Sequence, residues 1–478
     1  MKRALLALLL ALPVLAQQVT PPPPAPPREA KLPQPVEKTL ANGLRIIVVP
    51  KHTIPLVAAR LMIKTGAAAD PRGKDGLAEL TATVLTKGTK TRSAEQIARG
   101  VEALGATFAA TAGWDSTDVD LSVMSSNLPK AMEFVADVAR NATFAKEELE
   151  RERAQTIDAL QVDLTQPRTL ANAVMSRLIF GDAPYGHNAN GIPATLKKIA
   201  RKDLVKFHAT HYRPDNAVLV LAGDVQPEDA FALAEKTFGP WKRGAAAAPV
   251  TVKASETTPR ILVIDMPDAG QSAVVVGRRG IRRTDEAYLQ ALVANSVLGG
   301  GYSSRLNQEI RIKRGLSYGA GSSFSPRADV GPFTARTETK HESAAEVTGI
   351  LVGEMSRLSA ADVPETELTP RKAVPIGDFA QSLESTSGIV KGVAELALYG
   401  LPLSDINRYI SGVQSVTAED VRKFAASNLG GKDVSIVIAG DAKKFAEPLK
   451  EQFGDVEVIS AAELDLASST LRVRKAKQ

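Results

Sequence analysis

The sequence contains no cysteine among its 478 residues. It therefore cannot form a disulfide framework, and a bacterial lipoprotein anchor is excluded because that anchor is attached to a cysteine. After Ala16 no apolar run is long enough to cross a membrane. The formal net charge is only +6, partly located at the two ends, so the composition does not predict a nucleic-acid-binding surface.

The first residues have the composition of a secretory signal peptide. Met1-Lys2-Arg3 is basic, an apolar run follows from Ala4 to Ala16, and Val14-Leu15-Ala16 fits a cleavage site before Gln17. We therefore expect a signal peptide at 1–16 and a periplasmic or secreted protein without a membrane anchor. Residues 17–35 contain a dense proline cluster and are predicted to form a disordered, extended linker.

The length of the chain favours two or more domains, and a repeated pattern supports this expectation. The sequence from Asp203 to Phe207, followed by Gly223-Asp224, matches the sequence from Asp420 to Phe424, followed by Gly440-Asp441, at a constant offset (441 − 224 = 217). Such a match indicates an internal duplication. We expect an N-terminal domain at 36–243, a linker at 244–257, a C-terminal domain at 258–465 and a frayed basic tail at 466–478.

The stretch from Gly76 to Thr89 has apolar residues at helical spacing and ends in a Lys-Gly-Thr stop. It resembles G-L-A-H-F-L-E-H-M-L-F-K-G-T, a diagnostic segment of the insulinase/pitrilysin family of zinc peptidases. The matching residues are Gly76, Leu77, Ala78, Leu85, Lys87, Gly88 and Thr89. In that family H-x-x-E-H places two imidazoles on one helix face to bind Zn²⁺, with the Glu as general base. Here the motif is replaced by Glu79-Leu80-Thr81-Ala82-Thr83.

The position of the family's third zinc ligand is also changed. That ligand is a Glu on a later helix, and the matching context, which begins at Glu150, places Ala159 there. Asp158 would point about 100° away round the helix and is no obvious substitute. Glu79 could be a metal ligand, but Thr83 is a poor zinc donor and Ala82 cannot accept a proton. We therefore predict a degenerate zinc site at Glu79, Ala82, Thr83 and Ala159, no metal in this chain, and no peptidase activity of the chain alone.

A second segment, from Leu298 to Tyr318, predicts a glycine turn, a basic amphipathic helix and a strand from Ser317 to Phe324. A phosphate loop is disfavoured because neither the Walker nor the G-x-G-x-x-G spacing is present. The segment resembles the family's L-G-G-G-x-S-S-R-L-x-x-E-x-R-x-K-R-G-L-x-Y. That resemblance implies that Arg311 and Tyr318 contact the substrate backbone, with the phenol helping to polarise the scissile carbonyl. The structural alternative is a surface ion pair for Arg311 and a Tyr318 packed on the sheet.

Two further patterns bear on function. Pro184-Tyr185-Gly186-His187 resembles another landmark of the family, usually P-Y-G-H-P. His208 and His211 have a spacing that could bind a metal, but no third ligand is evident nearby. We interpret these two histidines as packing or exposed residues.

The resemblance covers residues 36 to about 465 and implies an α+β fold. It predicts two homologous α/β-roll domains, each an antiparallel sheet covered by helices, in a clamshell arrangement. The leading hypothesis is a zinc-less subunit of a secreted metallopeptidase heterodimer. A homologous partner subunit would then hold the zinc, peptide substrates would occupy the chamber, and this chain would supply Arg311 and Tyr318.

Two alternatives remain open. The first is a peptide-binding or structural scaffold with no role in catalysis. The second, a lone peptidase with an unusual metal site at Glu79, needs ligands that the sequence does not supply.

Overall fold

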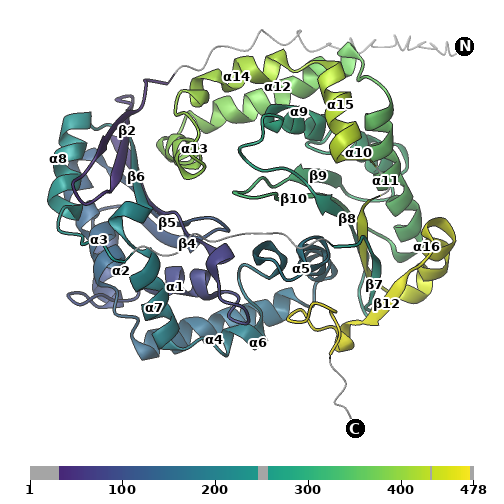
Figure 1. Cartoon of the computed structure of the whole chain (residues 1–478), viewed down its shortest axis with the longest axis horizontal. Coiled ribbons are helices and arrows are strands. Elements are labelled where there is room, and N and C mark those ends of the chain that lie inside the picture. Colours follow the sequence, from purple (N-terminus) through teal and green to yellow (C-terminus); the bar gives the residue numbers. More distant parts are fainter. Residues whose placement is uncertain (1–31, 246–256, 431–432, 474–478) are drawn as a thin grey trace, which may run out of the picture.

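The computed structural model describes residues 32–245, 257–430 and 433–473. The expected signal peptide at 1–16 and most of the expected linkers at 17–35 and 244–257 lie outside the described residues. Two six-stranded sheets, one from each half of the sequence, stand on opposite sides of the molecule (Figure 1). Helices cover both sheets, as the α+β clamshell prediction requires.

The first sheet has the strand order β1-β2-β6-β3-β5-β4. Its strands are β1 (Val36–Thr39), β2 (Arg45–Pro50), β3 (Leu56–Ile63), β4 (Thr107–Ala112), β5 (Thr117–Met124) and β6 (Ala217–Gly223). Helices from the same half pack against one face and enclose a hydrophobic core. They are α1 (Leu77–Leu85), α2 (Ala94–Ala103), α3 (Leu128–Asn141), α4 (Lys146–Asp163), α6 (Pro193–Leu196), α7 (Arg201–His211) and α8 (Pro227–Phe238). Helix α2 begins with a capping box, in which Ser93 and Gln96 form reciprocal hydrogen bonds.

The second sheet has the order β12-β7-β11-β8-β10-β9. Its strands are β7 (Ile261–Asp265), β8 (Ser272–Arg279), β9 (Ala320–Phe324), β10 (Pro332–Thr339), β11 (Ser435–Gly440) and β12 (Glu457–Ser460). The helices of this half are α9 (Tyr288–Leu298), α10 (Arg305–Asn307), α11 (Ala344–Ala360), α12 (Glu365–Ser382), α14 (Asp405–Ser415), α15 (Ala418–Asn428) and α16 (Ala446–Phe453). The expected strand from Ser317 begins only at Ala320.

The two sheets repeat one topology, as the constant sequence offset predicts. The order β2-β6-β3-β5-β4 in the first sheet corresponds to β7-β11-β8-β10-β9 in the second. The outer strands differ, because β1 precedes β2 and pairs antiparallel with it, whereas β12 follows β11 and pairs parallel with β7. The expectation of antiparallel sheets therefore needs a correction: β2–β6 and β7–β11 are parallel pairs.

Two helices cross from one half to the other. Helix α5 (Pro167–Phe180) packs on β8 and β11 of the second sheet, and α13 (Thr386–Leu398) packs on β3 and β6 of the first. Val174 and Ile389, one on each helix, are fully buried at these contacts. Each fully buried aliphatic side chain contributes about 1.5–3 kcal/mol of hydrophobic free energy. The exchange therefore ties the two halves into one body.

The tips of two hairpins meet near the ends of the crossing helices. The Asp115 carboxylate, between β4 and β5, accepts hydrogen bonds from the hydroxyls of Tyr185 (2.6 Å) and Tyr399 (3.1 Å). It also accepts the backbone N–H of Ala328, between β9 and β10, at 2.9 Å. Burial lowers the pKa of neighbouring Arg327 to about 10, so its guanidinium remains charged at neutral pH beside this carboxylate. Tyr185 of the P-Y-G-H landmark also accepts the backbone N–H of Asp329 in the second half at 3.4 Å, so it helps to join the halves.

The C-terminal segment corrects the expectation of a frayed tail from residue 466. Leu471 is fully buried against the second sheet, and Arg177 donates a hydrogen bond to the carbonyl oxygen of Leu466 at 3.1 Å. At the other end of the described chain, the side-chain amide of Asn407 bonds both the N–H and the carbonyl oxygen of Leu32. The last residues of the expected proline-rich linker therefore contact the folded body.

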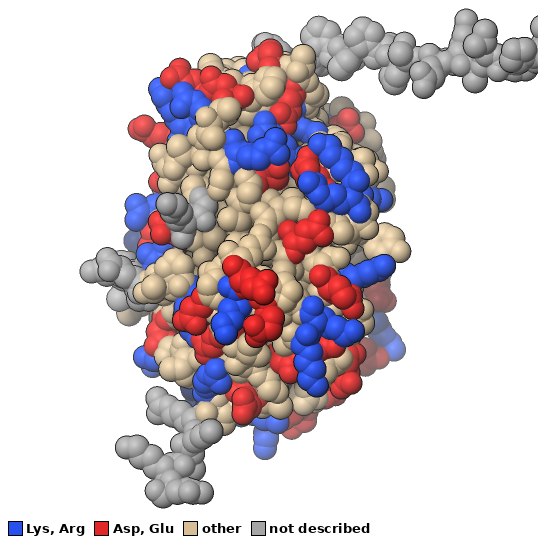
Figure 2. Space-filling view, turned by 90° about the vertical axis from the view of Figure 1, so that its right-hand side faces the viewer, with Lys and Arg blue, Asp and Glu red and all other residues tan. Residues whose placement is uncertain are grey.

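The surface carries charges of both signs. Figure 2 shows the face over the second sheet, where basic and acidic side chains are interspersed and neither sign forms a continuous area. This face lacks the one-sign surface that a protein uses to follow a phosphate backbone. Among the described residues, no helix is both long enough and apolar enough to cross a membrane.

Because α5 and α13 each pack on the sheet of the opposite half, a core substitution on one of these helices should lower the stability of the half on which the helix packs. Ile389→Ala on α13 should lower the free energy of unfolding by about 2–5 kcal/mol because it leaves a cavity against the first sheet. Trp241 is buried in the core of the first half, and Trp114 lies where the first half meets Arg327 of the second. Urea unfolding followed by tryptophan fluorescence therefore reports on the first half and on its contact with the second. The exposed Ile54→Ala is the control. An unchanged fluorescence transition in Ile389→Ala would contradict the coupling.

Candidate functional site

Helix α1 keeps the backbone frame of the zinc motif for structural reasons. The buried Asp70 carboxylate accepts the N–H groups of Gly76 (2.7 Å) and Ala78 (2.8 Å) at the start of the helix. Gly76 has φ +91°, and a Cβ there would lie 2.9 Å from the carbonyl oxygen of Asn190. Only glycine fits such a position without strain. The frame therefore remains because the fold needs it, whether or not metal binds.

The end of α1 is joined to α4. Lys87 forms an ion pair with Glu152 at 3.2 Å, and the carboxylate of Glu152 is largely buried. This contact holds together the two helices that carry the family's three zinc-ligand positions. The two helices on which the resemblance predicts the zinc ligands are thus packed against each other.

The positions predicted to form the degenerate zinc site come together only in part. Glu79, Thr83 and Ala159 line one cavity of about 170 Å³ between α1 and α4. Ala82 is fully buried and does not line it. Asp163 does line the cavity, and sequence reasoning missed it. It lies four residues after Ala159, which places both on one helix face, and that spacing could have revealed it.

The carboxylate of Glu79 is bound to protein rather than free for a metal. Its Oε2 accepts the backbone N–H of Ala112 in β4 at 2.7 Å, and its Oε1 accepts the Thr83 hydroxyl at 3.5 Å. Burial raises the pKa of Glu79, and these two hydrogen bonds offset the rise only in part. Within residues 32–245, 257–430 and 433–473, no three His, Cys, Asp or Glu side chains form a group that could hold a metal. The residues present do not fit a catalytic zinc ion.

Arg311 lies in a different cavity, in the second half. This cavity has a volume of about 590 Å³ and is lined by the glycine turn Gly299–Gly301, by Tyr302 and by strand β10. The Arg311 guanidinium lies over the Tyr302 ring, 4.9 Å from its centroid. Arg336 on β10 lines the same cavity. A guanidinium facing an open cavity can donate hydrogen bonds to carbonyl or carboxylate oxygens.

The structural alternative for Arg311 and Tyr318 does not match the structure. In the part of the chain that the structure describes, Arg311 forms no ion pair and the Tyr318 hydroxyl forms no hydrogen bond. The Tyr318 side chain is 95% exposed instead of packed on the sheet. It does not line the cavity of Arg311, although its neighbour Gly319 does. Both side chains are therefore available to a ligand or to another chain.

The segment around Arg311 differs from the expected amphipathic helix. Gln308–Lys313 (η5) forms a π-helical turn, a conformation that often occurs at functional sites. Gly299 allows close packing, because a Cβ there would lie 2.3 Å from the backbone nitrogen of Ser322. This glycine serves the approach of β9, which agrees with rejecting a phosphate loop.

The two histidines of α7 have packing roles. A ring nitrogen of His208 lies 2.9 Å from the carbonyl oxygen of Ala139, and its ring packs on Tyr212. His211 packs on Phe207. Burial lowers the pKa of both histidines. Their spacing therefore reflects one half-buried, packed helix face.

Comparison with known proteins assigns the chain to a family. Residues 45–186 match the profile "Insulinase (Peptidase family M16)", and residues 198–373 match "Peptidase M16 inactive domain". An uncharacterized zinc protease of Rickettsia bellii is 30% identical over 334 residues, which cover 69% of this chain and 79% of that protein. The chain belongs to the insulinase (M16) peptidase family. The predicted resemblance is confirmed.

Two solved M16-like structures complete the comparison. The peptidase M16 inactive domain from Pseudomonas fluorescens superposes with a TM-score of 0.81 and 28% identity, over 85% of this chain and 98% of that one. The periplasmic protease PqqL of Escherichia coli shares the fold, with a TM-score of 0.70 and 17% identity over 90% of this chain and 51% of its own. Together with the missing zinc ligands, the inactive-domain matches support a non-catalytic member of the M16 family.

The intact frame predicts that a metal site can be restored. The triple variant Glu79→His, Thr83→His and Ala159→Glu places the three missing ligands around the α1–α4 cavity. We expect it to bind one Zn²⁺ roughly 10-fold or more tightly than a control that keeps Ala159. Isothermal titration calorimetry compares the two. Equal affinities would show that α1 and α4 no longer hold the ligand positions.

The raised pKa of Glu79 predicts a pH dependence of stability. Folding favours the protonated carboxyl, so this contribution is present below the unfolded-state pKa of about 4.3 and is lost as pH rises through the folded-state pKa. Glu79→Gln removes this titration. Its free energy of unfolding relative to wild type should therefore increase from about pH 4 to about pH 7 in urea titrations. Glu102→Gln, at an exposed carboxylate on α2, is the control, and a pH-independent difference would refute the assignment.

Proposed function

We propose that the protein is the zinc-less subunit of a secreted or periplasmic M16 peptidase, which forms a heterodimer with a homologous zinc-bearing subunit. One contrast carries this proposal. All four predicted zinc-site positions lack the family's residues, whereas Arg311 and Tyr318 remain. Among the described residues Arg311 forms no ion pair, and the Tyr318 hydroxyl forms no hydrogen bond. A chain that had become a pure scaffold would have no need to keep an exposed phenol beside an open cavity.

In this arrangement the partner subunit supplies the zinc and the general base. Arg311 binds backbone carbonyl oxygens of the peptide and fixes its position. The Tyr318 hydroxyl donates a hydrogen bond to the scissile carbonyl, whose oxygen gains negative charge in the transition state. Both roles need donated hydrogen bonds, which a guanidinium and a phenol hydroxyl can supply.

The proposed location rests on the expected signal peptide at 1–16. The fold shared with a periplasmic protease of Escherichia coli is compatible with it. A scaffold or peptide-binding protein with no role in catalysis is the competing function, and the experiment below separates the two.

The proposal predicts activity only in a mixture. A candidate zinc-bearing M16 chain from the same organism is assayed alone and with this chain, using a quenched fluorescent peptide library. Tyr318→Phe should lower kcat of the mixture by about two orders of magnitude, because a transition-state donor is removed. Arg311→Ala should raise KM roughly 10-fold, because a substrate contact is removed.

Arg314→Ala is the matched control, because Arg314 is exposed on the same segment but paired with Glu309 at 2.5 Å. Complex formation is checked for every variant by analytical ultracentrifugation. If the mixture cleaves no better than the zinc chain, or if all three variants behave like wild type, the chain is a scaffold.

A further inference from the structure

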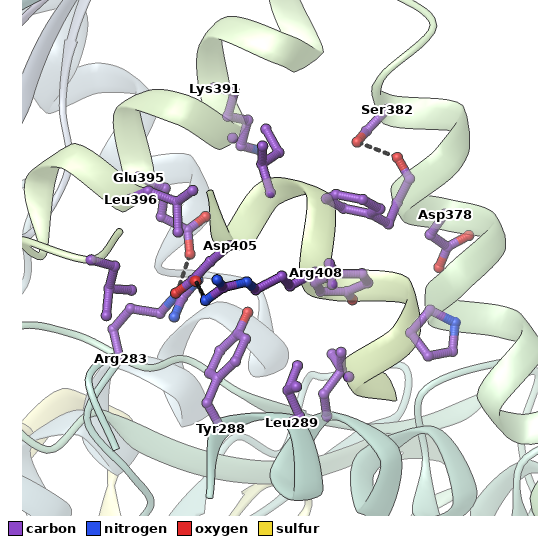
Figure 3. Close-up of a pocket in the computed structure, with 18 of the residues that line it drawn as sticks. Arg283, Tyr288, Leu289, Asp378, Ser382, Lys391, Glu395, Leu396, Asp405 and Arg408 are labelled. Atoms are coloured by element: carbon purple, nitrogen blue, oxygen red, sulfur yellow. Dashed lines mark hydrogen bonds and ion pairs between the residues drawn. The ribbon is translucent and has the colours of Figure 1, made fainter. Parts of the chain in front are cut away.

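The second half contains a larger cavity that the proposed function does not use. It has a volume of about 700 Å³ and lies between helices α9, α12, α13 and α14 (Figure 3). Ligand pockets commonly have volumes of about 300–1,000 Å³. None of Glu79, Thr83, Ala159, Arg311 and Tyr318 lines it.

The internal duplication relates this cavity to the α1–α4 cavity, which contains the degenerate zinc-site positions. Helices α4 and α12 have equal lengths, and both α4/α12 and α5/α13 are offset by the same interval (365 − 146 = 386 − 167 = 219). Four α12 residues line the large cavity. Subtracting the offset of 219 from their numbers gives the four α4 residues that line the α1–α4 cavity. The α12 residues are Pro375, Asp378, Phe379 and Ser382, and the α4 residues are Thr156, Ala159, Leu160 and Asp163. The large cavity is therefore the second-half counterpart of the α1–α4 cavity, and Asp378 occupies the position that Ala159 has in the first half.

The walls of this cavity offer aromatic surface. Phe379 on α12 and Tyr409 on α14 are stacked, with ring centroids 4.1 Å apart and planes at 21°. Tyr288 on α9 lines another side, and the Arg283 guanidinium lies 3.8 Å from its ring centroid. Exposed faces of aromatic rings attract apolar groups and cations.

Acidic side chains outnumber basic ones around the cavity. The basic residues are Arg283, Lys391 and Arg408, and the acidic ones are Asp285, Glu286, Asp378, Glu395 and Asp405. Two ion pairs each join one of these basic residues to one of the acidic ones. They are Arg283–Glu395 at 2.5 Å and Arg408–Asp405 at 3.7 Å. Figure 3 shows these two pairs on one side of the cavity and Asp378 apart from them on the other. In the described structure Asp285, Glu286 and Asp378 form no ion pair, and Lys391 is the only unpaired basic residue in the lining.

We propose that this cavity binds a cation with an apolar or aromatic body. The stacked rings of Phe379 and Tyr409 accept the body, and the unpaired carboxylates, Asp378 foremost, attract the positive charge. A basic peptide segment and a free aromatic amine share this chemistry. This site is independent of the proposed peptidase role, because neither Arg311 nor Tyr318 lines it.

The experiment measures binding to the full chain. A short fluorescein-labelled peptide of alternating Leu and Lys is titrated by fluorescence anisotropy beside a matched Leu/Glu peptide. Tryptamine is added as a competitor. The Leu/Lys peptide or tryptamine should bind and the Leu/Glu peptide should not. Whether the peptide, the amine or both bind distinguishes the two sources of the ligand.

Two variants test the location. Gly392 lines the cavity on α13 and has room for a side chain, so Gly392→Leu fills the site and should weaken binding at least about 10-fold. Gly377→Leu, at a helical glycine of α12 outside the cavity, is the matched control and should bind like wild type. Asp378→Asn should weaken binding roughly 3-fold. Absence of binding by both cationic probes, equal binding of the Leu/Glu peptide, or equal effects of Gly392→Leu and Gly377→Leu would overturn the proposal.

Discussion

The packing of α5 and α13 on each other's sheets is the contact on which the remaining structure depends. Each sheet has one face covered by helices of its own half and part of the other face covered by a helix of the opposite half. Neither half can move far without exposing buried valine, leucine and isoleucine side chains of both. The bonds of Tyr185 and Tyr399 to Asp115 fix the same arrangement at the hairpin tips. The two cavities with candidate functions in the second half therefore belong to one packed body.

The residues of the zinc motif that this chain retains are those that the fold requires. Gly76 and the Lys87–Glu152 pair persist because backbone geometry and helix packing require them. The ligand positions carry no such requirement, and Glu79 now accepts a backbone N–H of strand β4. A buried carboxylate with such a partner helps to hold α1 on the sheet. The resemblance of this motif to active peptidases thus indicates a shared fold. Whether the motif can bind zinc depends on the individual residues at the ligand positions.

Much of the fold follows from local signals in the sequence. The capping box at Ser93, the apolar spacing of α1 and the equal offset of β6 and β11 are properties of short segments, and the structure contains all three. The exchange of α5 and α13 was not predictable in this way, because an apolar helix face does not reveal which sheet it covers. The same reason applies to Leu471, whose burial depends on a distant partner. The π-helical turn at Arg311 depends on tertiary packing around the glycine turn, and charge pattern alone favoured an ordinary helix.

We infer that this chain has the frame of an M16 peptidase without its catalytic metal. The most direct test is the zinc content of the purified chain, measured by mass spectrometry, together with its hydrolysis of a peptide library with and without a chelator. We expect no stoichiometric zinc and no chelator-sensitive cleavage. One zinc per chain, with cleavage that disappears in Glu79→Ala, would contradict it.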